Sequence, residues 1–125
     1  MPGYEFIDKK EFLEVKEVFD KSNILFRHSF DHLRNGVYKV KDFENKFRSK
    51  MNSKYALAVT SGTAALRVAI ASLDLDDGDE IITQSFTFVA TVEAITESRC
   101  KPIIADIDHS LNMDPKSLVK KITKK

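Results

Sequence analysis

The sequence contains a single cysteine, no tryptophan, three prolines and four glycines among its 125 residues. One cysteine excludes an internal disulfide and disfavours a cysteine metal cluster. Cys100 lies between Arg99 and Lys101, and neighbouring cations can make an exposed thiol more reactive. A buried thiol is the commoner case, and we interpret Cys100 as structural. The glycines and prolines form no linker or low-complexity tract, and a hydrophobic share of 42% is typical of a globular chain.

The sequence also lacks an excess of either charge. Lysine and arginine number 20 against 19 aspartates and glutamates, so no bulk charge attracts nucleic acid or an acidic membrane. The opening Met1-Pro2-Gly3-Tyr4-Glu5 does not resemble a secretory signal, and no apolar run reaches the length of a membrane span. We therefore expect a cytoplasmic protein that acts on small molecules, with no nucleic acid and no membrane among its partners.

Hydrophobic spacing predicts helices and strands in a definite order. Residues 9–20 and 39–51 show helical periodicity, and residues 22–36 between them show none, which suits an irregular segment. The second half predicts strands at 57–60, 80–84 and 102–107, alternating with helices at 63–73 and 87–98 and a last helix after the Asp114-Pro115 cap. Alternating strands and helices favour a mainly parallel α/β sheet. The apolar stripes of these helices are interpreted as core: Val40, Phe43, Phe47 and Met51 in one, Leu66, Ile70 and Leu73 in another.

One turn in this pattern is suited to an anion. The expected strand at 57–60 runs through Ser61, Gly62 and Thr63 directly into a helix, where free backbone N–H groups and the helix dipole converge. Small residues leave room for a ligand, and the hydroxyls add donors. The alternative is an ordinary strand-to-helix junction in which Ser61 only caps the helix. From local physics alone both interpretations remain open.

Several further segments follow at characteristic spacing. In order they are Asp77-Gly78-Asp79-Glu80, Ile81-Ile82-Thr83, Gln84 to Thr91 and Lys101 to Asp108. Together with Tyr55 to Leu66, they resemble the DegT/DnrJ/StrS family of pyridoxal-phosphate-dependent sugar aminotransferases, which have the aspartate aminotransferase fold. The likeness covers nearly the whole chain. Pro2 to Glu5 and the region from Leu25 to Glu44 resemble one branch in particular, whose enzymes aminate C8 of an eight-carbon sugar acid of lipopolysaccharide.

The resemblance implies a fold and a domain organisation. The fold class is α/β, the N-terminal part of the large domain of the aspartate aminotransferase (fold type I) fold, with a mainly parallel sheet flanked by helices and preceded by N-terminal helices. We expect residues 1–54 to form an N-terminal helical segment and residues 55–125 an incomplete cofactor-binding α/β domain. In that fold, strands from later in the sequence separate the first strand from the next two. The strand at 57–60 is therefore expected either to keep open edges or to pair non-natively with 80–84.

The resemblance also assigns site residues. It implies that pyridoxal 5'-phosphate is held by Ser61, Gly62, Thr63 and Ala64 through its phosphate, and by Phe88 stacked on its ring. On sequence alone Phe88 would be a core residue, and Phe86 is interpreted as one. Arg27 is a candidate for binding a substrate carboxylate or phosphate, with a surface salt bridge as the alternative. Other polar residues are interpreted as solvent-exposed or structural: Asp106, Asp108, His28, His32 and His109.

The implied reaction needs groups that this chain lacks. Transamination requires a lysine that bonds to the cofactor and an acid that pairs with its pyridine nitrogen, and both lie beyond residue 125 in the family. The run from Lys120 to Lys125 resembles a cut end. We expect an inactive fragment of a homodimeric aminotransferase that moves an amino group from glutamate or glutamine to a keto-sugar. The alternatives are a related sugar dehydratase and a non-catalytic α/β phosphate-binding or interaction module, whereas a Rossmann-like domain is disfavoured because its glycine fingerprint is missing.

Overall fold

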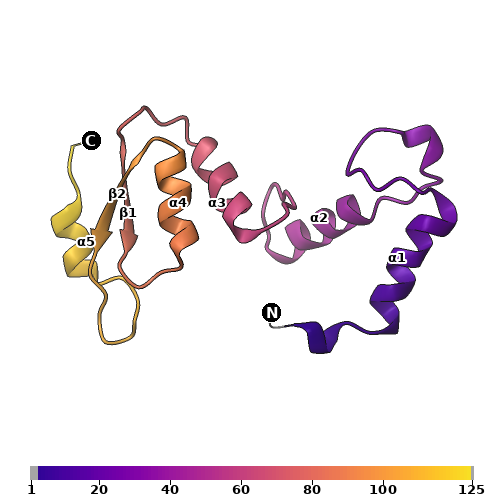
Figure 1. Ribbon diagram of the computed structural model, residues 1–125, viewed down its shortest axis with the longest axis horizontal. Helices are drawn as coiled ribbons and strands as arrows, with labels where there is room; N and C mark the ends of the chain where they lie inside the picture. The colour runs from indigo at the N-terminus through magenta and orange to yellow at the C-terminus, as the bar shows by residue number, and fades with distance from the viewer. Residues whose placement is uncertain (1–2, 125) are drawn as a thin grey trace. The chain divides into compact units, whose positions relative to one another are not determined.

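The computed structural model describes residues 3–124 (Figure 1). The chain falls into two compact units, Met1–Ala58 and Val59–Lys125. The boundary predicted from sequence, after residue 54, lies slightly earlier. In the structure the backbone N–H of Ala58, at the end of the first unit, donates a hydrogen bond to Glu44 of the same unit.

The first unit consists of helices joined by an irregular segment. It contains a 3-10 turn at Tyr4–Phe6, α1 at Lys9–Lys21, a second 3-10 turn at Asp31–Leu33 and α2 at Lys39–Lys50. Asp8 starts α1 with a reciprocal capping box: its side chain accepts from the N–H of Lys10 at 2.7 Å, and its own N–H donates to Glu11 at 2.8 Å. Both helices lie within about a residue of their predicted bounds.

The irregular segment before α2 is organised by a buried arginine. Arg34 is only 3% exposed, and its guanidinium donates hydrogen bonds to the carbonyl oxygens of Ser29 at 2.7 Å, His28 at 3.1 Å and Phe26. Its guanidinium carbon also lies 5.3 Å from the ring centroid of Tyr38. Ser29 and Phe30 both adopt left-handed backbone conformations, with φ of 70° and 59°. The three carbonyl contacts thus hold a turn that these residue types rarely form.

The second unit is a small α/β layer. It contains α3 at Gly62–Ala71, β1 at Glu80–Gln84, α4 at Val89–Glu97, β2 at Lys101–Ala105 and α5 at Pro115–Lys121. The two strands pair in parallel, from Glu80 opposite Lys101 to Gln84 opposite Ala105. The sheet lies between α4 and α5, and α3 lies on the far side of α4 (Figure 1). This arrangement confirms the predicted α/β class with a parallel sheet.

The core of the second unit lies where α4 meets the sheet. Its best-buried side chains are Ala94, Ile95 and Ala105, each at most 2% exposed. Cys100 is buried beside them, which agrees with a structural thiol. The Asp76-to-Asp79 turn joins α3 to β1, and Gly78 has φ of 89°, a left-handed conformation that glycine adopts without strain.

The predicted strand at 57–60 is not a strand in this structure. Within the described residues the sheet contains only β1 and β2, so the segment has no neighbour to pair with. A strand is stabilised by ladder hydrogen bonds to a partner, and apolar sequence alone does not form one. Of the two expected outcomes, open edges or non-native pairing with 80–84, the structure shows the unpaired segment.

Several apolar residues predicted to be core are exposed. The exposed residues on α2 are Val40, Phe43 and Phe47, and Met51 follows at its C-terminal cap. Leu66 on α3, Leu73 after that helix and Phe86 in the loop before α4 are exposed as well. The helical spacing was identified correctly. Burial additionally needs a second layer. Within residues 3–124 α3 packs mainly on α4, and Leu66 and Val68 on α3 remain exposed.

Candidate cofactor-binding site

Ser61 caps the N-terminus of α3. Its backbone is extended, with φ of −161° and ψ of 165°, and its Oγ accepts a hydrogen bond from the N–H of Ala64 at 3.1 Å. Its carbonyl oxygen accepts from the N–H of Ala65 at 3.0 Å. For the N–H groups of Gly62 and Thr63, no acceptor is found within residues 3–124. The first turn of α3 therefore offers two free donors at the positive end of the helix dipole.

A hollow of about 620 Å³ lies beside this turn. Gly62 and Thr63 line it from α3, and Phe88 lines it from the start of α4. Its remaining walls come from small and apolar groups of the two helices together with one hydroxyl: Ala65, Leu66, Ala69, Ala90 and Thr91. Apolar walls with a few converging polar groups are typical of small-molecule sites.

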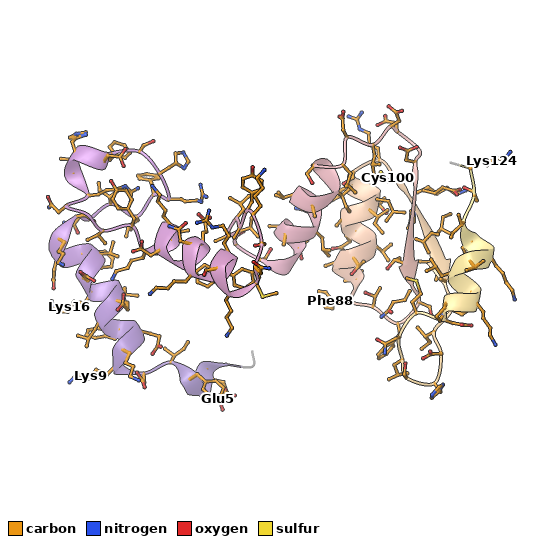
Figure 2. The ribbon with its side chains drawn as sticks, turned by 180° about the vertical axis from the view of Figure 1, so that it is seen from behind. Glu5, Lys9, Lys16, Phe88, Cys100 and Lys124 are labelled. Carbon is orange, nitrogen blue, oxygen red and sulfur yellow. The ribbon has the colours of Figure 1, made fainter. Side chains whose placement is uncertain are left out.

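The loop after β1 presents Phe88 to this hollow. The N–H of Ser85 donates to the carbonyl of Ala105 at 3.0 Å, which ties the loop to β2. The Gln84 side chain donates to the carbonyl of Phe86 at 2.7 Å, and the hydroxyls of Thr87 and Thr91 are paired at 3.0 Å. Phe88 itself is 75% exposed and stands at the N-terminal end of α4 (Figure 2). Its ring is therefore not part of the core of this unit.

The predicted cofactor residues divide into two groups. Gly62, Thr63 and Phe88 line one hollow, although they come from different helices. Ser61 and Ala64 are outside the lining, and the Ala64 N–H donates a hydrogen bond to the Ser61 side chain. Ser61 thus shapes the turn, and Ala64 has no backbone donor left for a ligand.

Arg27 belongs to the first unit and is paired with Glu44. Its Nε lies 3.0 Å from Glu44 Oε1, and its Nη2 lies 2.7 Å from Oε1 and 2.8 Å from Oε2. Glu44 also accepts from the N–H of Ala58 at 2.8 Å. That backbone N–H and then the guanidinium hold the pKa of Glu44 below its usual value. The salt bridge weighed as the alternative for Arg27 is present, while its Nη1 has no acceptor within residues 3–124.

Arg27 also lines a basic hollow of about 430 Å³ in the first unit. Lys41, Arg48 and Lys54 contribute further cations, and Tyr38 and Tyr55 contribute rings. Lys41 lies 5.6 Å from the Tyr38 ring centroid and Lys54 lies 5.2 Å from that of Tyr55. In the described part of the chain none of these three cations forms a salt bridge. Two carboxylates, Asp31 and Glu44, also line the hollow, so its cations, Arg27 included, outnumber its anions.

Glu44 was missed in the sequence analysis. Its one signal in the sequence was its place directly after Phe43 in the apolar pattern of this helix; a glutamate that becomes buried there needs a partner for its charge. Sequence alone could not supply its partners, because Arg27 and Ala58 lie far from it along the chain.

The remaining polar candidates have local partners. The hydroxyl of Ser117 donates to Asp106 Oδ2 at 3.1 Å and accepts from the Asp106 N–H at 2.9 Å. The hydroxyl and N–H of Ser110 bind Asp108 and lower the pKa of its carboxyl. Within residues 3–124 no cluster of three or more acidic, histidine or cysteine side chains could hold a metal ion, and no helix has the length and hydropathy of a membrane span.

Comparison with known proteins identifies the family. Residues 16–125 match the DegT/DnrJ/EryC1/StrS aminotransferase family. The chain belongs to this family. It is 36% identical over 124 residues to the UDP-2-acetamido-2-deoxy-3-oxo-D-glucuronate aminotransferase of Pseudomonas aeruginosa, covering 95% of this chain and 33% of that protein. It is 41% identical over 86 residues to the spore coat polysaccharide biosynthesis protein SpsC of Bacillus subtilis, covering 68% of this chain and 22% of SpsC.

Solved structures show the same relationship. The GDP-4-keto-6-deoxy-D-mannose-3-dehydratase of E. coli, with bound hydrated pyridoxal phosphate, superposes with a TM-score of 0.78 at 29% identity, over 94% of this chain and 30% of that one. An aminotransferase from Psychrobacter cryohalolentis superposes with a TM-score of 0.76 at 27% identity, over 94% of this chain and 28% of that one. The DegT/DnrJ/EryC1/StrS chain thus has part of the fold type I architecture and spans about a third or less of these relatives' length.

Pyridoxal 5'-phosphate is the cofactor of this family, and the described residues fit it. The free N–H groups of Gly62 and Thr63 suit a phosphate, and the exposed face of Phe88 suits an aromatic ring. A Cβ built on Gly62 meets no atom within 4 Å, so no protein group fills the space beside the turn. The hollow therefore combines anion donors, an aromatic face and room for a ligand.

Proposed function

We propose that this chain is the phosphate-binding part of a pyridoxal-phosphate-dependent sugar aminotransferase. The full-length protein would move an amino group from glutamate or glutamine to a keto-sugar in cell-surface polysaccharide or lipopolysaccharide biosynthesis. The observation that supports it most directly is the hollow that brings Gly62, Thr63 and Phe88 together. Two relatives of the chain, the UDP-sugar aminotransferase and the spore coat polysaccharide protein, support the substrate class and the pathway type.

Each residue of the hollow has a distinct part in this proposal. The N–H groups of Gly62 and Thr63, with the Thr63 hydroxyl, would hold the cofactor's phosphate at the start of α3. Ser61 would keep that turn in shape through its cap. Phe88 would lie against the pyridine ring and limit its tilt. When bound, pyridoxal phosphate supplies the electron sink that amino transfer requires.

Arg27 and the basic hollow suit an anionic substrate. Glu44 occupies the Nε and Nη2 of Arg27, and Nη1 remains available for a carboxylate or phosphate. Lys41, Arg48 and Lys54 add positive charge around it. Both a nucleotide-linked sugar and a sugar acid carry an anionic group that could bind there. The role of Arg27 in substrate binding is a prediction. The homodimer and the cytoplasmic location are predictions as well.

A related sugar dehydratase is the second candidate. The likeness to the E. coli 3-dehydratase favours it, since that structure superposes about as well as the Psychrobacter aminotransferase. In this family the two reactions differ at one position, lysine in the aminotransferases and histidine in the dehydratases, which lies outside these residues. A non-catalytic module with the same phosphate turn is the remaining alternative.

The test uses the full-length protein. It is loaded with pyridoxal phosphate and given L-glutamate or L-glutamine with either a UDP-linked keto-sugar or a keto-sugar acid, and the aminated sugar is measured by mass spectrometry. We expect amino transfer to one of the two sugars and none by a Phe88→Ala, Thr63→Val double variant at low cofactor concentration. Loss of water from the sugar without amination would support the sugar dehydratase. Failure to bind the cofactor would contradict both enzymes and favour the non-catalytic module.

A further inference from the structure

Helix α4 begins at an unusual residue. Phe88 occupies its N-cap position with an extended backbone, φ −71° and ψ 140°. Serine, threonine, aspartate and asparagine are preferred there, because their side chains accept hydrogen bonds from the first free N–H groups of a helix. A phenyl ring cannot accept such a bond, and at 75% exposure this ring is not stabilised by burial either. Natural sequences break local rules of this kind chiefly at functional or strained sites.

Thr91 holds the backbone on both sides of Phe88. The N–H of Thr91 donates to the carbonyl oxygen of Phe88 at 3.0 Å. The Thr91 hydroxyl pairs with the hydroxyl of Thr87, the residue before Phe88, also at 3.0 Å. Thr87 and Thr91 are four residues apart, which is about one helical turn. The pair therefore ties the loop to the first turn of α4, where a capping side chain is missing.

Thr91 is also part of the wall of the candidate cofactor site. It lines the same hollow as Gly62, Thr63 and Phe88, and all four residues belong to the second unit. Thr91 is half-buried, whereas the Phe88 ring projects into open space. Once the backbone around Phe88 is held, only the two torsions of its own side chain remain free to turn the ring.

We propose that Thr91 is a positioning residue for Phe88: its N–H and its hydroxyl together hold the loop so that the ring faces the hollow. This inference rests on the proposed function, in which Phe88 lies against the pyridine ring of the cofactor. An aromatic face that already points at the ligand avoids the cost of being ordered at the moment of binding. Thr91 acts through Phe88 and does not itself contact the cofactor.

The experiment is a double-mutant cycle in the full-length apoprotein, read out as the dissociation constant of pyridoxal 5'-phosphate. Thr91→Val removes the hydroxyl and keeps the branched shape of the side chain. We expect it to weaken binding by about threefold to tenfold, the contribution of one neutral hydrogen bond. In the Phe88→Ala background the same change should have no further effect, because the ring that Thr91 orients is gone.

Two further variants test the hydroxyl pair itself. Thr87→Val removes the other partner and should weaken binding as much as Thr91→Val does. Because Thr87 lies in an exposed loop, this variant decides if Thr91→Val does not fold. Thr91→Ser keeps a hydroxyl at this position and should bind nearly as tightly as the wild type.

Circular dichroism of the bound cofactor gives a second measurement. Pyridoxal phosphate is achiral, so at saturation its visible dichroic band reports how firmly the protein fixes its ring. Thr91→Val and Thr87→Val should both reduce this band. Thr96→Val is the matched control on α4, because its hydroxyl bonds the carbonyl of Val92 at 2.9 Å and lies outside the hollow. It should leave both the affinity and the band unchanged.

The outcomes separate the inference from the proposed function. If the wild-type protein does not bind the cofactor, or if Phe88→Ala binds it equally well, the proposed site is wrong and this inference falls with it. If Phe88→Ala weakens binding but Thr91→Val and Thr87→Val do not, only the positioning role is overturned. An effect of Thr91→Val that persists in the Phe88→Ala background would also overturn it, since Thr91 would then contact the cofactor or support the fold in general.

Discussion

Lys39 of α2 bridges two carboxylates of α1, Glu17 and Glu14. Glu17 also pairs with Lys21 at 2.5 Å on its own helix. The hydrogen bonds from Lys21 and Lys39 lower the pKa of Glu17 from 4.5 to about 2. The same bonds from Glu14 and Glu17 raise the pKa of Lys39. The cluster of Glu14, Glu17, Lys21 and Lys39 therefore links the two helices through charge.

This cluster predicts how the stability of the first unit depends on pH. Because the folded pKa of Glu17 lies below its unfolded value, its contribution is present above about pH 4.5 and is lost as the pH falls toward 2. Glu17→Gln should remove this part of the acid dependence, and 1 M salt should weaken it in the wild type. All three tyrosines, Tyr4, Tyr38 and Tyr55, belong to the first unit, so tyrosine fluorescence during urea unfolding measures it directly.

Glu93→Gln, in the second unit, is the control for the loss of one carboxylate. Its tyrosine-detected unfolding should follow the wild-type pH profile. If the stability of Glu17→Gln falls between pH 4.5 and 2 in the same way as that of the wild type, the role given to this cluster is contradicted.

We expect Thr63 and Gly62 to determine how tightly the phosphate group of the cofactor binds. In the full-length protein Thr63→Val should weaken pyridoxal phosphate binding by about 1.5–3 kcal/mol, or roughly ten- to over a hundredfold, because it removes a donor to a charged group. Gly62→Leu should weaken cofactor binding by filling the space beside the turn. Gly62→Ala should weaken cofactor binding less, because a Cβ at this position meets no protein atom within 4 Å. Fluorescence titration of the apoprotein measures each affinity.

The control for Thr63→Val is Thr96→Val. The Thr96 hydroxyl bonds the carbonyl of Val92 on α4 and does not line the hollow. Its loss should leave cofactor affinity unchanged. Wild-type affinity in both Thr63→Val and Gly62→Leu would rule out the phosphate assignment.

Phe88 is predicted to act through a flat apolar face. Phe88→Ala should loosen the cofactor in the full-length protein, while Phe88→Tyr and Phe88→Trp should be tolerated. Because the ring is mostly exposed, Phe88→Ala should change the stability of the apoprotein little. Phe86→Ala, in the same loop but outside the hollow, is the matched control. If alanine proves harmless at position 88 and tryptophan disruptive, the residue is tightly packed instead of stacking on the cofactor.

The 125-residue chain itself should catalyse no amino transfer. The lysine that bonds to the cofactor and the partner of the pyridine nitrogen lie elsewhere in the family, while the turn at Gly62 needs only its own helix to form. Borohydride reduction in the presence of pyridoxal phosphate, followed by peptide mapping, should give scattered partial labelling of surface lysines. A sample reduced before the cofactor is added serves as the blank. One fully labelled lysine together with amination of a keto-sugar would refute this prediction.

The sequence predicted most helices and two of the three strands because their signals are local. Apolar spacing located α2, and the Asp114-Pro115 cap located α5, since the residues that decide a helix lie within one or two turns of each other. The strand at 57–60 was wrong because pairing depends on distant segments. Dependence on distant segments also explains why the sequence did not indicate Glu44, whose hydrogen bonds are made with Arg27 and Ala58. Gly62, Thr63 and Phe88 could be indicated because each lies within a short motif.

The buried Arg34 has a consequence for how freely the segment around it can vary. Its guanidinium bonds carbonyl oxygens, which every amino acid provides, and makes no demand on the side chains at Phe26, His28 and Ser29. We therefore expect side-chain substitutions at Phe26 and His28 to leave these carbonyl contacts in place. Arg34 itself is not exchangeable for lysine, because an ammonium group lacks the planar fork that reaches three carbonyls at once. The course of this loop thus depends on one side chain, Arg34, more than on the side chains whose carbonyl groups it binds.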